Sequence, residues 1–200
     1  MSTPEPAATP GTPPGVPVPA PSPYNIANML TILRILFVPL FVWLLFAEGT
    51  GWRVGALVVF VVASITDRLD GELARKRHIV TDFGKIADPI ADKALTGSAL
   101  VSLSILGELW WWVTIVILVR EIGITLLRFV VIRYGVIPAS KGGKVKTTLQ
   151  VVAIALFILP GPFDPLRWAV MAAALAVTVA TGADYMLRAW RLSRGAAAGS

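Results

Sequence analysis

The 200-residue sequence has no cysteine and a single histidine, His78, and both shortages restrict the chemistry open to it. Without cysteine the chain forms no disulfide and offers no thiol nucleophile. Acidic residues are also few, since 12 Asp and Glu stand against 18 Lys and Arg, which gives a formal net charge of +6. We expect His78 to be a solvated loop residue. Disulfide frameworks, thiol enzymes and metal centres built from several histidines are therefore excluded.

Polar residues in general are scarce, because 56% of the residues are hydrophobic and only 15% are charged. The mean hydropathy of +0.73 is too high for a soluble globular protein, which needs a polar surface. We therefore predict an all-α integral membrane protein. In such a protein an excess of basic residues indicates loops that face anionic lipid or a site for an anionic substrate, and we expect no nucleic-acid partner.

Three regions divide the chain. Residues 1–23 contain nine of the fifteen prolines and cannot pack a core, so we predict a disordered tail there. This region lacks a charged segment followed directly by an apolar one, and we expect no cleavable signal peptide. Residues 24–192 are predicted to form one membrane domain with about six transmembrane helices, and residues 193–200 a flexible tail. The apolar segments are residues 29–47, 52–66, 86–106, 109–132, 147–160 and 166–187.

The distribution of Lys and Arg between the loops predicts the orientation of these helices. With the N-terminus in the cytosol, most loop Lys and Arg lie on the cytosolic side, and only Arg53 and Arg167 lie outside. We therefore expect a multi-pass protein of the cell (inner or plasma) membrane with both termini in the cytosol. Trp110, Trp111 and Trp112 then fall at the outer membrane interface, where indole rings prefer to lie.

Four aspartates lie between the second and third apolar segments, in the stretch "DRLDGELARKRHIVTDFGKIADPIAD". Asp67 and Asp70 are three residues apart and share one helix face, and Asp88 and Asp92, four residues apart, share a face of the next helix. Residues 78–84 are expected to form the turn between the two helices. Two antiparallel helices can therefore present four carboxylates to one another at the cytosolic edge of the membrane.

Carboxylates this close repel one another and are expensive near lipid, so we expect divalent metal to compensate them. Oxygen-only ligands suit Mg²⁺, Mn²⁺ or Ca²⁺ rather than zinc. Two such ions about 4 Å apart clamp a phosphoryl group in displacement chemistry. Gly71 and Gly84 would let a phosphate approach the backbone, and Arg75 is placed to meet an anion. Asp82 is interpreted as a helix cap or a solvated residue.

The same stretch resembles the signature of the CDP-alcohol phosphotransferase family, D-x-x-D-G-x-x-A-R, eight residues, G-x-x-x-D-x-x-x-D, and meets every fixed position of it. The resemblance extends from about Tyr24 to Arg191. It implies an enzyme that transfers a group from a CDP-linked donor to an alcohol and releases CMP. It also implies that Asp67, Asp70, Asp88 and Asp92 bind two metal ions, normally Mg²⁺ with Mn²⁺ possible, and that Asp92 is the base for the acceptor hydroxyl.

Further roles follow from the resemblance. Members of this family are commonly homodimers, and their lipid donor keeps its acyl chains in the bilayer. The residues implied to contact CDP-diacylglycerol are Gly71, Ala74, Arg75 and Thr81, together with Ile26, Ala27, Asn28, Met29 and Thr31.

Residues 120–150 and 25–39 resemble the branch of the family that uses CDP-diacylglycerol and sn-glycerol 3-phosphate and makes phosphatidylglycerol phosphate. Basic residues in and after the fourth apolar segment favour such an anionic acceptor, because a phosphate monoester could compensate their charge. The residues expected to bind the acceptor phosphate are Arg120, Arg128, Lys144 and Lys146.

Several alternatives stay open. Arg120 could instead pair with Glu121 and fix helix packing, while the lysines follow the positive-inside distribution. Counting residues places Arg120 near the middle of the bilayer, so either the helix slides or a polar cavity reaches inward. A cardiolipin synthase or an inositol-phosphate enzyme of the same family is the closest alternative function. A divalent-cation transporter is more distant because it would hold its carboxylates near the membrane midplane, and a structural scaffold has no use for paired carboxylates.

Overall fold

The computed structural model describes residues 26–77, 82–131 and 141–198, and within these ranges the chain forms helices and no strand. The predicted all-α class is therefore confirmed. The predicted tail over residues 1–23 lies outside the described residues, as does His78. The helices are α1 (Ile26–Phe46), α2 (Thr50–Arg77), α3 (Asp82–Ile105), α4 (Trp111–Val131), α5 (Lys141–Ile158) and α6 (Asp164–Ala198).

Several helix boundaries differ from those that hydropathy predicts, and α5 begins at Lys141, six residues before the predicted apolar segment 147–160. Helix α3 begins at Asp82, so the last three residues of the turn expected over residues 78–84 are helical instead. An aspartate is one of the residues that helix N-termini favour, and its charge suits the helix dipole there. Helix α6 continues to Ala198 and includes most of the segment predicted as a C-terminal tail. Its last residues are Gly-Ala-Ala-Ala, and alanine has the highest intrinsic helix propensity.

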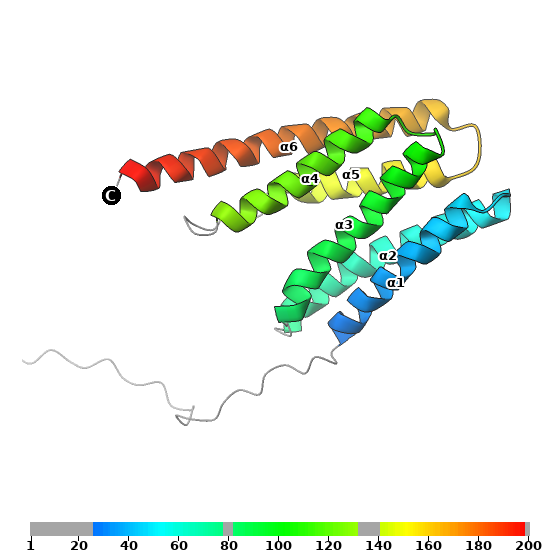
Figure 1. Cartoon of the computed structure of the whole chain (residues 1–200), viewed down its shortest axis with the longest axis horizontal. Helices are drawn as coiled ribbons and strands as arrows, with labels where there is room; N and C mark the ends of the chain where they lie inside the picture. Colours follow the sequence, from blue (N-terminus) through cyan, green and yellow to red (C-terminus); the bar gives the residue numbers. More distant parts are fainter. Residues whose placement is uncertain (1–25, 78–81, 132–140, 199–200) are drawn as a thin grey trace, which may run out of the picture.

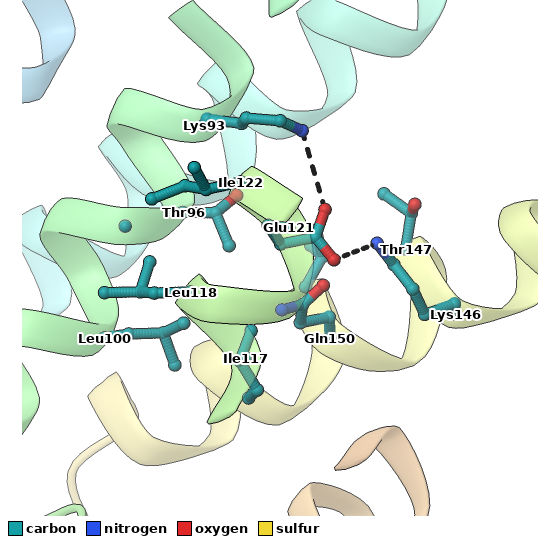
Figure 2. Close-up of a pocket in the computed structure, with 12 residues that line it drawn as sticks. Lys93, Thr96, Leu100, Ile117, Leu118, Glu121, Ile122, Lys146, Thr147 and Gln150 are labelled. Carbon is teal, nitrogen blue, oxygen red and sulfur yellow. Dashed lines mark hydrogen bonds and ion pairs between the residues drawn. The ribbon is translucent and has the colours of Figure 1, made fainter. Parts of the chain in front are cut away.

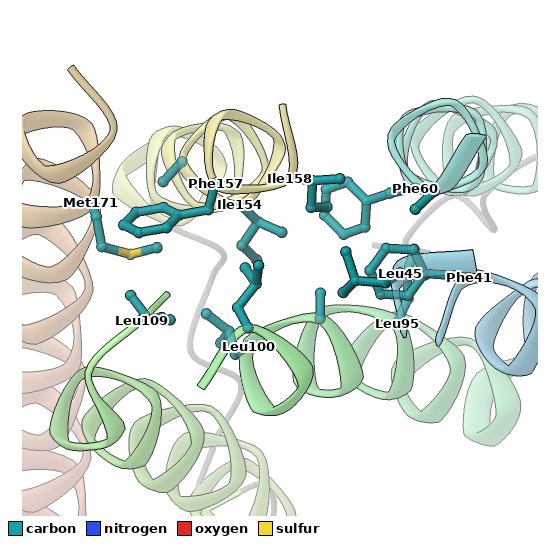
Figure 3. Packing of buried hydrophobic residues seen from close by; sticks show 14 of the residues in the cluster. Phe41, Leu45, Phe60, Leu95, Leu100, Leu109, Ile154, Phe157, Ile158 and Met171 are labelled. Carbon is teal, nitrogen blue, oxygen red and sulfur yellow. The ribbon is translucent and has the colours of Figure 1, made fainter. Parts of the chain in front are cut away.

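One apolar core joins the six helices. Helix α1 packs against α2 and α3, and α6 packs against α5 and α4, with α3 lying between the two groups (Figure 1). The rings of Phe41 and Phe60 meet with centroids 5.7 Å apart on one side of this core. Figure 3 shows Leu100 and Ile154 between those rings and the group around Phe157 on the other side. The core therefore fixes α3 and α5 against each other in the middle of the molecule.

Arg53, near the start of α2, contacts the end of α5 and the segment between α3 and α4 at one end of the bundle. Its Nε donates to the carbonyl oxygen of Ile158 at 3.1 Å, and its Nη2 donates to the carbonyl oxygen of Phe157, also at 3.1 Å. The same guanidinium forms an ion pair with Glu108, which lies between α3 and α4. The start of α2, the end of α3 and the end of α5 therefore share this end. The end of α2 and the starts of α3 and α5 consequently lie toward the opposite end. The four aspartates are at this opposite end, on α2 and α3.

By length and composition, α6 over Asp164–Arg191 is the one helix of the described residues that could cross a membrane by itself. Shorter apolar helical stretches run over Ile32–Phe46, Thr50–Thr66 and Lys93–Ile105. Large apolar side chains also face outward, such as Leu36, Val119 and Leu126. Many exposed large apolar side chains are unusual on a soluble monomer. The count of six membrane crossings stays a prediction.

Candidate active site

The helical backbone carries the four signature aspartates as their spacing predicts. Asp67 and Asp70 lie in the last three turns of α2, and Asp88 and Asp92 lie in the first three turns of α3. Their side chains are outside the described residues, so the carboxylate geometry stays a prediction. No group of three or more His, Cys, Asp or Glu gathers among the side chains that are described. The donor set itself, four carboxylates at helical spacings on consecutive helices, fits Mg²⁺ or Mn²⁺.

A cavity of about 90 Å³ lies between α3, α4 and α5, near the start of α3 (Figure 2). Its apolar wall includes Leu100 and Ile117, which both belong to the hydrophobic core. Its polar wall is formed by side chains from all three helices, namely Lys93 and Thr96 of α3, Glu121 of α4, and Lys146, Thr147 and Gln150 of α5. The cavity thus combines an apolar floor with a small set of converging polar groups, as ligand sites usually do.

Glu121 is the centre of this polar group. Lys146 donates from Nζ to Glu121 Oε1 at 2.5 Å, and Lys93 Nζ lies 3.5 Å from Oε2 (Figure 2). Arg120 donates from Nη1 to Oε1 at 3.0 Å. Among the described side chains, three cations therefore share one carboxylate, which leaves an excess of two positive charges. Lys146 is only 6% exposed, whereas the Lys93 side chain is 29% exposed, so part of this excess is buried.

An excess of positive charge in such a place is unfavourable without a partner. Burial removes the hydration of Lys146, and Glu121 can compensate only one of the three cations. A bound anion would supply the missing negative charge and accept charge-assisted hydrogen bonds from the ammonium groups. The cavity is therefore suited to an anionic ligand.

Arg120 extends away from the cavity toward α6. Its Nε donates to the carbonyl oxygen of Thr178 at 3.1 Å, and its Nη2 donates to Thr181 Oγ1 at 2.9 Å. Gly182 makes room for it, because a Cβ atom at that position would lie 3.2 Å from Arg120 Cγ. The pair of Arg120 with Glu121 that the alternative interpretation expected is present. Arg120 thus connects the charged cluster to α6.

The two lysines predicted for the acceptor have different environments. Lys146 is buried at the cavity, whereas Lys144 is exposed. Residues two apart on a helix point in nearly opposite directions, so both cannot face the same cavity. Arg128 lies on α4, but its side chain is outside the described residues. The same holds for the side chains of the residues expected to bind the nucleotide on α1 and α2, and Thr81 is not described at all.

Of the polar and charged residues that line the cavity, only Lys146 was predicted as a site residue, and Lys93, Thr96, Glu121, Thr147 and Gln150 were not. Lys93 directly follows Asp92, and Glu121 was considered only as a partner of Arg120. Gln150 lies four residues after Lys146, on the same face of α5. That spacing was a signal, since a second polar residue one turn from a buried lysine indicates a polar helix face. The cavity reaches Glu121, in the middle of α4 and next to Arg120, and the depth of Arg120 in the membrane stays a prediction.

Comparisons with known proteins agree with the signature. A family model described as CDP-alcohol phosphatidyltransferase matches residues 24–180. A protein of Mycobacterium tuberculosis named "Probable phosphatidylglycerophosphate synthase" is 56% identical over 172 residues, which cover 84% of this chain and 82% of the relative. A Bacillus subtilis protein named "CDP-diacylglycerol--glycerol-3-phosphate 3-phosphatidyltransferase" is 34% identical over 185 residues, covering 84% and 96%. An Escherichia coli protein of the same name is 39% identical over 140 residues, covering 66% and 75%.

Proposed function

The chain belongs to the CDP-alcohol phosphatidyltransferase family, and we propose that it transfers the phosphatidyl group of CDP-diacylglycerol to sn-glycerol 3-phosphate. The products are phosphatidylglycerol phosphate and CMP, so the enzyme serves phospholipid biosynthesis. The names of its relatives support both substrates. The single structural observation that carries the choice of acceptor is the charged cluster around Glu121.

Charge favours a phosphorylated acceptor over the alternatives. A phosphate monoester carries about 1.5 to 2 negative charges at neutral pH, which matches the excess of two positive charges that Lys93, Arg120 and Lys146 leave beside Glu121. Serine has no net charge and phosphatidylglycerol carries only one negative charge. Inositol phosphate has the right charge, so charge alone does not separate it from glycerol 3-phosphate, and the assay below compares the two.

The order of residues on α3 connects the acceptor cavity to the chemistry. Asp92 is the proposed base, and the next residue, Lys93, contacts Glu121 at the cavity. Consecutive residues of a helix have Cα atoms about 3.8 Å apart and side chains on adjoining faces. A phosphate held by Lys93 and Lys146 would therefore leave the glycerol hydroxyls within reach of Asp92.

In the proposed reaction, the C1 hydroxyl oxygen of the acceptor attacks the phosphorus that bears diacylglycerol. Asp92 takes the hydroxyl proton as the new P–O bond forms, and the P–O bond to CMP breaks. Asp67, Asp70, Asp88 and Asp92 would hold two Mg²⁺ ions, which supply charge neutralisation at the diphosphate when bound. The proposed contacts to the nucleotide are Gly71, Ala74, Arg75 and Thr81, with residues 26–31 at the start of α1.

We further propose that the six helices cross the membrane with both termini and the active site on the cytosolic side, and that the enzyme works as a homodimer in contact with membrane lipid. The Lys and Arg distribution supports this orientation, and exposed tryptophans at the end opposite the aspartates support a membrane interface there, since Trp110, Trp111 and Trp112 are 59%, 49% and 53% exposed. Indole rings at that level are typical of a membrane interface. Lys93 and Lys146 would then line a cavity near the cytosolic side, with Arg120 beside it.

The test uses purified protein in detergent with Mg²⁺ and CDP-diacylglycerol. Glycerol 3-phosphate, phosphatidylglycerol, inositol 1-phosphate and serine are offered separately, and CMP release and the lipid product are followed. We expect CMP with glycerol 3-phosphate alone, and its loss in Asp92→Asn. CMP with another alcohol only would overturn the acceptor, and well-folded protein that yields no CMP with any acceptor would contradict the transferase activity itself.

A further inference from the structure

Gln150 is a buried polar residue of the cavity for which the reaction as described has no use. Its side chain is 3% exposed, and it lines the cavity together with Lys146, one turn earlier on α5. Its amide nitrogen, Nε2, has no hydrogen-bond partner in the part of the chain that the structure describes. Figure 2 shows the carboxamide reaching from α5 toward Glu121 and Ile117 of α4.

A buried amide group without a hydrogen-bond partner needs a structural explanation. Nearly all buried polar groups in proteins are hydrogen-bonded, because leaving one unpaired costs its full hydration. The neighbouring wall is apolar at Leu100, Ile117 and Val151, so an apolar residue at position 150 would complete it without that cost. A ligand group that fills the cavity and bonds the amide accounts for a glutamine here.

We infer that Gln150 recognises the second hydroxyl of the acceptor, the one on C2 of glycerol 3-phosphate, and so determines specificity for a polyol phosphate. This inference rests on the proposed function. The lysines already provide charged donors for a phosphate, whereas a carboxamide both donates and accepts, as a hydroxyl does. The C1 hydroxyl is consumed in the reaction, which leaves the C2 hydroxyl in need of a partner.

The spacing along α5 fits the size of this ligand. Four residues of helix rise about 6 Å, which separates the level of Gln150 from that of Lys146. That distance is comparable with the span of a three-carbon polyol phosphate. With the phosphate on Lys146 and Lys93, the C2 hydroxyl can point along α5 toward the carboxamide of Gln150 while C1 turns back toward Asp92, near the start of α3.

The experiment compares two acceptors that differ in one hydroxyl, glycerol 3-phosphate and 3-hydroxypropyl phosphate. Values of kcat/KM for CMP release are measured with the full-length wild type, with Gln150→Met and with Val152→Met, a control at an exposed position of the same helix. We expect the wild type to prefer glycerol 3-phosphate by roughly tenfold or more, because an unpaired buried amide disfavours the analogue. Gln150→Met should lose roughly that factor on glycerol 3-phosphate and change by less than about twofold on the analogue.

Every other outcome counts against the inference. An equal loss on both acceptors in Gln150→Met would show that the residue only supports packing, and an unchanged preference would show that another group reads the hydroxyl. The wild-type comparison needs no variant, so a wild type without preference overturns the inference even if Gln150→Met fails to fold. A wild type that uses neither compound but releases CMP with another alcohol overturns the proposed function as well. This result distinguishes a failure of the proposed function from a failure of the Gln150 inference alone.

Discussion

Lys146 of α5 donates to Glu121 of α4 across the cavity, with Nζ 2.5 Å from Oε1. This contact joins a helix predicted as a membrane crossing to a segment predicted as a basic cytosolic loop. Because Glu121 also contacts Lys93 of α3, one carboxylate holds the three helices that line the cavity. Binding an anion and keeping these helices together therefore depend on the same few charges.

The contrast between Lys146 and Lys144 gives the first prediction. Lys146→Met should raise the KM for glycerol 3-phosphate by roughly ten- to hundredfold, because a hydrogen bond to a charged group contributes about 1.5–3 kcal/mol. The KM for CDP-diacylglycerol should change little. Lys144→Met should cost less, since that side chain is exposed and screened by solvent. Steady-state CMP release with each substrate varied in turn measures both constants. A larger loss at Lys144 would contradict the assignment of the cavity.

Gly182 and Gly123 allow a second comparison, between a variant that should affect Arg120 and a control. A Cβ atom at Gly182 would lie 3.3 Å from Arg120 Nε, whereas nothing lies within 4 Å of one at Gly123. Gly182→Ala should shift the guanidinium away from Thr178 and Thr181 and raise the acceptor KM roughly three- to tenfold. Gly123→Ala should leave the KM unchanged and raise the thermal stability slightly, because alanine favours a helix by about 0.5–1 kcal/mol over glycine. Kinetics and thermal unfolding in detergent test both variants. Equal behaviour of the two would contradict a positioning role for α6.

Metal removal tests the four signature aspartates. Chelation with EDTA should abolish CMP release, and Mg²⁺ or Mn²⁺ should restore it, because carboxylate-only sites select hard cations. Asp92→Asn should lower kcat by at least about 10²-fold, as expected when a general base is lost. Asp82→Asn, at the first residue of α3, is the control and should keep the metal dependence. Full activity in EDTA would contradict the proposed metal site.

Local patterns predicted the helices and the placement of the four aspartates on two consecutive helices. Apolar segments and i,i+3 or i,i+4 spacings depend only on neighbouring residues. The start of α3 at Asp82 was missed because hydropathy marks the apolar part of a helix and not its polar first turns. The eight fixed positions of the signature were specific enough to predict the family from the sequence alone. The composition of the acceptor cavity was harder, because it depends on how α3, α4 and α5 meet.

Lys93 and Gln150 illustrate that limit. Each lies on a different helix, and no pattern within either segment brings the two together. Their common cavity exists only because the core around Leu100 and Ile154 fixes α3 against α5. Arg120 shows the converse. Its charge in an apolar segment predicted a ligand site, but its bonds to Thr178 and Thr181 depend on a close approach of α6 that no local pattern contains.

The absence of cysteine makes the proposed orientation directly testable, because any single cysteine introduced into the chain is the sole site for a maleimide. Trp111 and Lys144 are both exposed; Trp111 begins α4 and Lys144 lies near the start of α5, at opposite ends of the bundle. A membrane-impermeant maleimide should label Trp111→Cys in intact cells and Lys144→Cys only in inverted vesicles, because Lys and Arg concentrate on the cytosolic side. Permeabilised membranes should label both, and the cysteine-free parent neither. Labelling of both positions from the same side would overturn the proposed membrane crossing of α4, and the reversed pattern would place the Lys93–Glu121–Lys146 cavity on the wrong side for a cytosolic glycerol phosphate.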